Sequence, residues 1–105
     1  MLISITKIEL DSRTKLRAFF KFNRQIIQEL KESPCKKFKI RGSLNLKFWY
    51  TMTLWENDID LTNFYRKGKH LEAMKQSKKF SSKIQSHRLA KEDLIKWKEA
   101  KKLFN

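Results

Sequence analysis

The stretch LKFWYTMTLW, residues 46–55, decides the fold of this 105-residue chain. It is rich in aromatic and threonine side chains, which favour a β-strand. Successive side chains of a strand point to opposite faces of a sheet. One face would carry Phe48, Tyr50, Met52 and Leu54, and the other Trp49, Thr51, Thr53 and Trp55. Both faces are large and apolar, whereas a sheet packed on helices needs only one such face. The second face therefore needs cover from another sheet, a ligand or a partner chain.

The segments around this strand predict an α+β domain over residues 1–105. Turn residues and alternating patterns predict four strands, at 2–8, 36–42, 46–55 and 80–89. Helical spacing follows the first strand, returns after the capping residues Asn57, Asp58 and Asp60, and returns again at 92–104. The resulting order, βαββαβ with a C-terminal helix, is that of a ferredoxin-like sandwich.

The first helix is predicted between an N-cap at Asp11 or Ser12 and the break before Pro34. Its apolar stripe is predicted to comprise Leu16, Phe19, Phe20, Asn23, Ile26, Ile27 and Leu30. Asn23 is the one polar member, and a buried amide needs hydrogen-bond partners, so it either bonds backbone or faces a cavity. Phe22 lies off this stripe. The remaining face, with Lys15, Arg17, Lys21, Arg24, Gln28 and Lys31, is expected to be solvated.

The net charge of +14 invites an interpretation as a nucleic-acid-binding protein. Residues 1–57 and residues 58–105 each carry +7, however, so no basic arm exists. Lysines account for 19 of the 25 cations, and lysine lacks the fork with which arginine grips bases and phosphates. The alternation at Lys37, Lys39 and Arg41 is typical of a solvated strand face. A nucleic-acid partner is therefore not favoured, although binding of another polyanion stays open.

Other classes are excluded more directly. The single cysteine, Cys35, cannot form an internal disulfide. Apolar runs are far shorter than the roughly 20 residues of a membrane span. The first residues lack the basic and apolar regions of a signal peptide, so a cytoplasmic protein without membrane contact is expected.

The stretch from Phe48 to Asn57, followed by helical residues that end near Met74, resembles the antibiotic-biosynthesis-monooxygenase-like superfamily. The resemblance is nearest to its branch that looks like spheroidene monooxygenase, and it covers residues 46–78 best. It implies a dimeric α/β barrel in which two sheets pack face to face. In such a homodimer, the partner would cover the face of Trp49 and Trp55.

The resemblance also implies two activities. Some members of the superfamily oxidise polycyclic aromatic substrates with O2 and without a cofactor. Others degrade haem through a helix histidine, which His70 matches loosely. Ser4 and Thr6 stand where those proteins carry an asparagine on the first strand, and this departure argues against haem degradation.

The candidate site residues follow from chemistry and spacing. His70 is the candidate catalytic base, because histidine titrates near neutral pH. The candidate substrate-binding residues are Asn23, Trp49, Tyr50, Trp55 and Tyr65. Each also has a structural interpretation, since aromatic residues are more often core and a histidine after Gly68 can simply be hydrogen-bonded. Cys35, His70 and His87 lack a local ligand pair, so no metal site is expected.

The sequence thus predicts a monooxygenase-like protein that holds a small apolar or aromatic molecule between sheet and helices, without a cofactor. Three alternatives remain: haem binding through His70, a basic module for a polyanion, and an interaction protein whose tryptophans join subunits.

Overall fold

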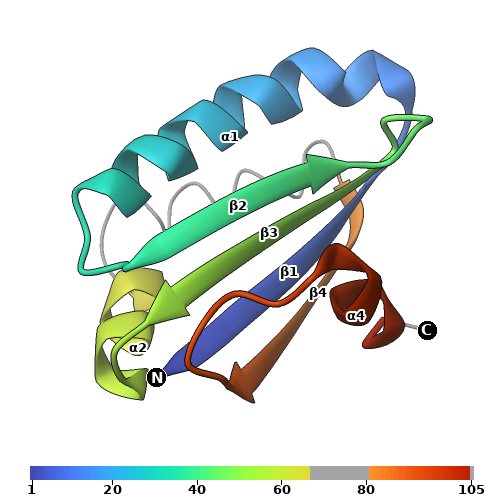
Figure 1. The fold of residues 1–105 in the computed structure, drawn as a ribbon. Coiled ribbons are helices and arrows are strands. Elements are labelled where there is room, and N and C mark those ends of the chain that lie inside the picture. The colour runs from blue at the N-terminus through green and yellow to red at the C-terminus, as the bar shows by residue number, and fades with distance from the viewer. Residues whose placement is uncertain (67–80, 105) are drawn as a thin grey trace.

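The computed structural model describes residues 1–66 and 81–104. Its elements are β1 (Leu2–Leu10), a 3-10 turn (Arg13–Lys15), α1 (Leu16–Lys31), β2 (Lys37–Gly42), β3 (Phe48–Trp55), α2 (Asp58–Arg66), β4 (Ser81–Ala90) and α4 (Trp97–Lys102). Figure 1 shows one sheet with α1 and α2 on one side and α4 on the other. The four predicted strands and the predicted α+β class are confirmed.

The sheet has the strand order β2-β3-β1-β4, and every neighbouring pair is antiparallel. The two central strands are therefore β1 and β3, which are paired along their whole length from Leu2 opposite Trp55 to Glu9 opposite Phe48. This order confirms the predicted ferredoxin-like arrangement. It also means that the side chains of β1 and β3 set the character of both faces.

On the first face, α1 and α2 cover Trp55, and on the second face a C-terminal segment covers Met52. The expectation that a partner chain covers the face of Trp49 and Trp55 is therefore wrong. Both tryptophans lie on the helix side, where Trp55 is fully buried and Trp49 packs on the edge of the core. The sequence showed that the strand has two apolar faces, but it did not show which face packs against the helices.

Helix α1 buries Phe19, Phe22, Ile26 and Leu30. The predicted stripe was thus wrong at two aromatic positions, because Phe22 is buried whereas Phe20 is 45% exposed. Both choices satisfy the spacing of three and four residues, so periodicity cannot separate them. Phe20 instead lies at the end of the sheet, where its ring meets the edge of Trp49 with 5.4 Å between centroids.

The start of α1 also differs from the expectation. No side chain caps the helix, and the N-cap position is Lys15 rather than Asp11 or Ser12. The chain enters through the 3-10 turn, in which the backbone N–H of Lys15 donates to the carbonyl of Ser12 at 3.1 Å. A 3-10 turn satisfies an orphan N–H group that a capping side chain would otherwise bind.

The turn between β2 and β3 spans residues 43–47. Leu46 adopts φ 60°, an unusual conformation for a side chain that branches beyond Cβ. Gly42 lies opposite Trp49 in the register. A Cβ atom at Gly42 would lie 2.8 Å from the indole ring, so glycine is needed for the close approach of Trp49.

The C-terminal strap, defined as residues 91–104, crosses the second face of the sheet (Figure 1). Leu94, Trp97 and Phe104 pack against the cluster of Ile3, Ile5, Met52 and Leu54. The predicted helix over 92–104 is wrong in extent, since only Trp97–Lys102 is helical. An extended stretch before it lets Ile95 reach towards β2, which a continuous helix would not allow.

Gly68, His70 and the continuation of the second helix predicted through Met74 lie outside the described residues. Among the residues that are described, no helix is long and apolar enough to cross a membrane.

Candidate ligand-binding cavity

Four hydroxyl side chains form the middle of the helix-facing side of the sheet. Ser4 is paired with Thr53 and Thr6 with Thr51 across β1 and β3. Ser4 and Thr53 are buried, at 1% and 6% exposure, whereas Thr6 and Thr51 are half-buried. We call these four residues the hydroxyl patch. Hydroxyl groups at the centre of a buried sheet face are costly unless they are hydrogen-bonded.

The two buried hydroxyls of the patch have partners. Trp55 Nε1–H donates to Thr53 Oγ1 at 2.8 Å, and Thr53 Oγ1 lies 3.4 Å from the carbonyl oxygen of Ser4, to which it donates. The hydroxyls of Ser4 and Tyr65 are hydrogen-bonded at 3.0 Å. The hydrogen bonds thus link the indole of Trp55 to Thr53, Thr53 to Ser4, and Ser4 to the phenol of Tyr65 on α2.

A cavity of about 50 Å³ lies between the hydroxyl patch, α1 and α2. Its apolar walls are Ile8, Phe22, Ile26, Leu30, Trp55 and Phe64, and its polar groups are Thr6, Asn23, Thr51, Thr53 and Tyr65. One water molecule needs roughly 10–15 Å³. The cavity therefore holds a few waters as it stands, and an aromatic ring enters only if neighbouring side chains move apart.

Asn23 lies on the helix wall of this cavity, opposite the sheet. Its side chain is half-buried, and none of the residues that the structure describes forms a hydrogen bond with its amide. A carboxamide offers two N–H donors and one oxygen acceptor. Asn23 is therefore equipped to bond a polar group of a molecule held in the cavity.

No charged side chain lines the cavity among the described residues. The donors and acceptors that the described residues provide are neutral hydroxyl and amide groups. Burial of an unpaired ion in such surroundings is strongly unfavourable. The site consequently suits an uncharged molecule that is mostly apolar and carries one or two hydrogen-bonding groups.

The structure brings together three of the five predicted substrate-binding residues. Asn23, Trp55 and Tyr65 all line the cavity. Trp49 does not, because its Nε1–H donates to the carbonyl of Leu46 at 2.8 Å and its ring lies 4.9 Å from that of Phe19.

Tyr50, the remaining predicted residue, lies on the second face. Its ring packs 6.3 Å from Trp97 and 6.0 Å from Phe104 of the strap. Burial raises the pKa of the Tyr50 phenol above its ordinary value of 10.0. Tyr50 is thus separated from the cavity by the sheet itself.

The histidines and the cysteine lie apart from the cavity where they are described. His87 is exposed on β4, with its ring 4.8 Å from that of Phe104. The Cys35 thiol donates to the carbonyl of Lys37 at 3.2 Å, and burial raises the pKa of the thiol above 9.0. Within residues 1–66 and 81–104, no three His, Cys, Asp or Glu side chains cluster as a metal site would require. His70 lies outside these ranges.

Sequence reasoning missed the hydroxyl patch. The signal was present as Ser4-Ile5-Thr6 and Thr51-Met52-Thr53, two pairs of hydroxyl residues spaced by two on adjacent strands. That spacing places each pair on one face of a strand. The pairing of the two strands, which sequence alone does not give, then joins the pairs into one patch.

The sheet order β2-β3-β1-β4 places the chain in the class of ferredoxin-like folds. Solved structures show which known proteins share this fold. The chain has the same fold as solved structures that are described as known or candidate antibiotic biosynthesis monooxygenases. No family model matches the sequence, and no curated protein is similar to it in sequence.

Three solved structures illustrate the similarity. A protein from Deinococcus radiodurans, described as a candidate antibiotic biosynthesis monooxygenase, is 13% identical, with a TM-score of 0.80 over 91% of this chain and 97% of its own. A second such candidate, from Nitrosomonas europaea, is 14% identical, with a TM-score of 0.76 over 89% and 100%. A conserved protein from Methanosarcina mazei Go1 is 15% identical, with a TM-score of 0.79 over 87% and 92%.

Proposed function

We propose that this protein binds a small, uncharged, mostly apolar or aromatic molecule in the cavity between the sheet and α1 and α2. The observation that carries the proposal is the hydroxyl patch beneath apolar walls. Ligand sites are typically apolar hollows with a few placed polar groups. Here the polar groups lie on both sides of the hollow, with Asn23 on the helix and Thr6, Thr51 and Thr53 on the sheet.

The activity that we propose for this site is oxygenation by O2 without a bound cofactor. A phenolic substrate that loses a proton from an adjacent CH2 group forms a carbanion, which adds O2. Loss of water then leaves a carbonyl group, so that the substrate itself supplies all the electrons. The cavity would contribute by positioning the substrate and excluding water. Structures of similar fold that are described as candidate monooxygenases support this choice.

The proton-accepting group of this reaction stays a prediction. Tyr65 is the one titratable side chain among the described cavity residues, and its hydroxyl is bonded to Ser4. The sequence predicts His70 as the base, and that residue lies outside the described ranges. The haem alternative also rests on His70, and no observation within the described part of the chain favours it.

Binding is tested by displacement of the uncharged fluorescent probe N-phenyl-1-naphthylamine with 2-naphthol or with naphthalene. Asn23→Leu keeps the volume of the helix wall but removes the amide. We expect this variant to lose about fivefold in affinity for 2-naphthol, equivalent to one neutral hydrogen bond of about 1 kcal/mol. Its affinity for naphthalene, which has no polar group, should stay unchanged.

The matched control is Tyr50→Phe, which removes a hydroxyl on the opposite face of the sheet. It should leave both affinities unchanged, and an effect equal to that of Asn23→Leu would count against the cavity. Catalysis is tested separately with 1,8-dihydroxyanthrone in an oxygen electrode. Ligand binding without O2 uptake would reject the oxygenase half of the proposal and leave the binding half standing.

A homodimer also remains a proposal, supported by the resemblance in fold. Because α1 and α2 cover the tryptophan face and the strap covers the other, a partner chain would have to meet an edge of the sheet or the outer surface of these covering segments. Light scattering of the purified protein measures the mass directly.

A further inference from the structure

The outer face of α1 carries a regular row of cations. Arg17, Lys21, Arg24 and Lys31 follow one another at steps of four, three and seven, with Gln28 in the remaining position, and all five side chains are exposed. Positions at such steps lie along one side of a helix. At 1.5 Å per residue the row is about 21 Å long. We call Arg17, Lys21, Arg24, Gln28 and Lys31 the α1 row.

The α1 row is unfavourable for the helix itself. Like charges at Arg17 and Lys21, and again at Lys21 and Arg24, destabilise a helix by a few tenths of a kcal/mol each. Arg17 lies in the first turn, where the helix dipole favours acidic residues, and that turn contains none. No carboxylate from the described residues forms an ion pair with any member of the row. Stability alone would not select this arrangement.

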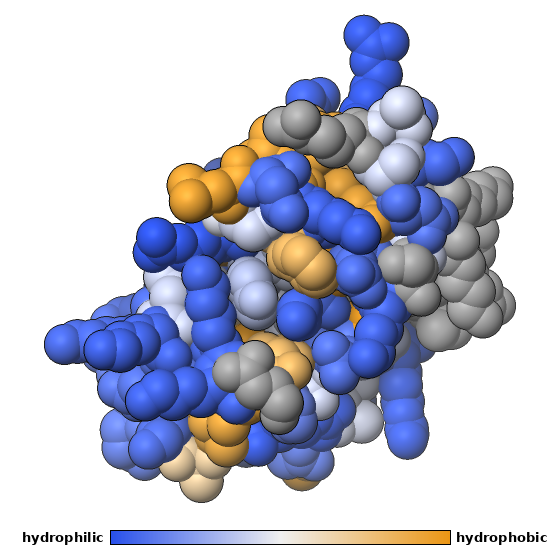
Figure 2. Space-filling model, turned by 90° about the vertical axis from the view of Figure 1, so that its right-hand side faces the viewer, coloured by the Kyte–Doolittle hydropathy of each residue, from blue (hydrophilic) through white to orange (hydrophobic). Residues whose placement is uncertain are grey.

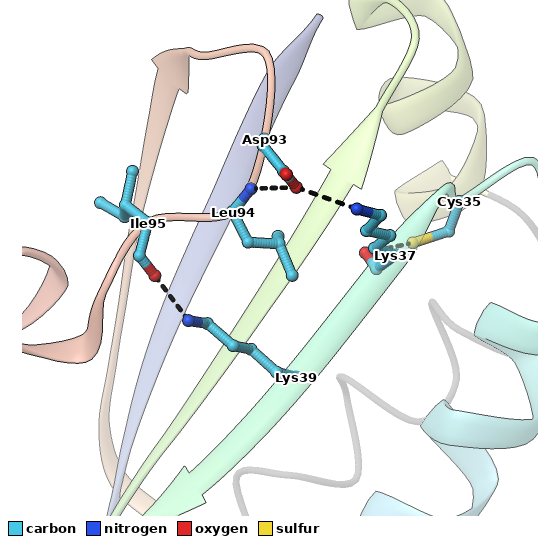
Figure 3. Close-up of polar contacts among 6 residues, drawn as sticks. All are labelled: Cys35, Lys37, Lys39, Asp93, Leu94 and Ile95. Carbon is cyan, nitrogen blue, oxygen red and sulfur yellow. Dashed lines mark hydrogen bonds and ion pairs between the residues drawn. The ribbon is translucent and has the colours of Figure 1, made fainter.

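Two cations of strand β2, Lys37 and Lys39, differ from the α1 row because they contact residues of the C-terminal strap. Figure 3 shows Lys37 bound to Asp93 at 3.3 Å, and Lys39 donating to the carbonyl of Ile95 at 2.6 Å. The ammonium of Lys39 also lies 4.9 Å from the centre of the Trp97 ring. Among the described residues, the members of the α1 row have no such partners, and the row differs from other surface cations by its regular spacing along one side of a helix.

The cations are concentrated in the first half of the row, from Arg17 to Arg24. Glu29 and Glu32 lie on either side of Lys31 in the sequence, and both also line a surface hollow with Lys21 and Arg24. Arg17, Lys21 and Arg24 have no acidic residue between them. Two of these three are arginines, although the chain has only 6 arginines among 25 cations. Arginine binds phosphate oxygens with two parallel hydrogen bonds.

From this geometry we infer that the α1 row, led by Arg17, Lys21 and Arg24, binds the phosphodiester backbone of a nucleic-acid duplex. A linear array of cations on a rigid helix is complementary to a linear array of phosphates. The proposed contacts are made to phosphates, which carry no information on base sequence. Binding is therefore independent of sequence. The inference does not depend on the ligand proposed for the cavity.

A membrane surface fits the row less well. Helices that lie in a lipid interface insert large apolar side chains beside their cations. Among the described residues of α1, Phe20 is the only large hydrophobic residue that is exposed. Figure 2 views the molecule from the side on which α1 begins, and the surface there is mainly hydrophilic, with separate hydrophobic patches.

The test measures binding of the whole chain to a labelled 20-base-pair DNA duplex over a series of salt concentrations. The triple variant Arg17→Gln/Lys21→Gln/Arg24→Gln keeps helix propensity close to that of the parent. We expect at least a tenfold loss of affinity at low salt. The slope of log K against log salt should become shallower by about 2 to 3, since each phosphate contact contributes about 0.9.

The matched control is Lys96→Gln/Lys98→Gln/Lys102→Gln, which removes the same charge from exposed positions of the strap. It should change affinity less than threefold and leave the slope unchanged. Arg17→Lys/Arg24→Lys keeps the charge but loses the paired hydrogen bonds of arginine, so it should leave the salt slope unchanged and lose less affinity than the triple variant. Circular-dichroism melting confirms that each variant is folded.

Three results would overturn the inference. The first is an equal loss of affinity in the triple variant and its control, which would indicate bulk charge. The second is no measurable binding of the unmodified chain to the duplex at 50 mM salt. The third is tighter binding to vesicles containing anionic lipid than to the duplex, which would assign the row to a membrane.

Discussion

The two faces of the central strands differ more than their shared sequence suggests. On the side of α1 and α2, β1 and β3 present Ser4, Thr6, Thr51 and Thr53, and a cavity lies above them. On the side of the strap, the same strands present Ile3, Ile5, Met52 and Leu54, which are buried without exception. Alternate residues of one strand pair thus build one face with hydroxyl groups at its centre and unfilled volume above them, and another face that is apolar and closed.

This difference separates two roles. A fully apolar face under a close cover contributes to stability, because each buried side chain adds about 1.5–3 kcal/mol of transfer free energy. A face with hydroxyls and unfilled volume gives up part of that stabilisation. The helix side is therefore where we expect function, and the strap side is where we expect stability.

The largest expected effect comes from Trp55, which is part of the hydrophobic core and is also hydrogen-bonded to the hydroxyl patch. Its ring is fully buried, packs 5.2 Å from Phe64 and is bonded to Thr53. Trp55→Ala should lower the free energy of unfolding by about 3–5 kcal/mol, measured by urea denaturation. The exposed Leu44 provides a control, since Leu44→Ala should stay within about 0.5 kcal/mol. A loss below 1 kcal/mol at Trp55 would show that the helix face is not packed as described.

A smaller effect distinguishes the two threonines of the patch. Thr53→Val removes the acceptor of the buried Trp55 N–H and should destabilise the protein by about 1–3 kcal/mol. At Thr51, which is half-buried and lines the cavity, the same substitution should cost less than about 0.5 kcal/mol. Equal losses of unfolding free energy in the two variants would mean that the hydrogen bond from the Trp55 indole to Thr53 does not add to stability.

The smallest effect concerns the tie between the strap and β2. The pKa of Asp93 is lowered from 3.8, chiefly by the hydrogen bond from the backbone N–H of Leu94 and then by Lys37. A carboxyl whose pKa is lower in the folded state stabilises that state above its unfolded pKa, and loses the effect as the pH falls through the folded pKa.

Asp93→Asn should therefore lower thermal stability slightly at pH 7, and the difference from the parent should shrink below about pH 3.8. Asp93 is exposed, so solvent keeps the effect small. The measurement is the melting temperature of both proteins from pH 7 to pH 2.5. A constant difference across that range would contradict a charge-dependent tie.

The sequence predicted the elements of the fold better than the arrangement of its faces. Side chains alternate with a period of two residues along a strand, and this short pattern located all four strands. The order of the elements then led to the right fold. The rotation of α1 was mispredicted because Phe19, Phe20 and Phe22 satisfy two helical stripes equally well. The cover of the Trp55 face was mispredicted because alternation shows that two faces exist, but not which neighbour meets each.

The candidate site was predicted in part for the same reason. Asn23, Trp55 and Tyr65 were found from their residue types, and the structure brings them to one cavity. Tyr50 was placed with them although it lies one residue out of phase with Trp49 and Trp55, on the other face of β3. The hydroxyl patch needed the antiparallel register of β1 and β3, which is a tertiary fact that no local pattern contains.

The strap has a consequence for how the protein is made. It leaves the sheet from one edge strand, β4, and is tied to the opposite edge strand, β2, through Asp93 and Ile95. While a ribosome is still adding residues 94–104, the apolar side chains of Ile3, Ile5 and Met52 have no intramolecular cover. The nascent chain therefore reaches its native state only when synthesis of this segment is complete, and until then it needs protection from aggregation.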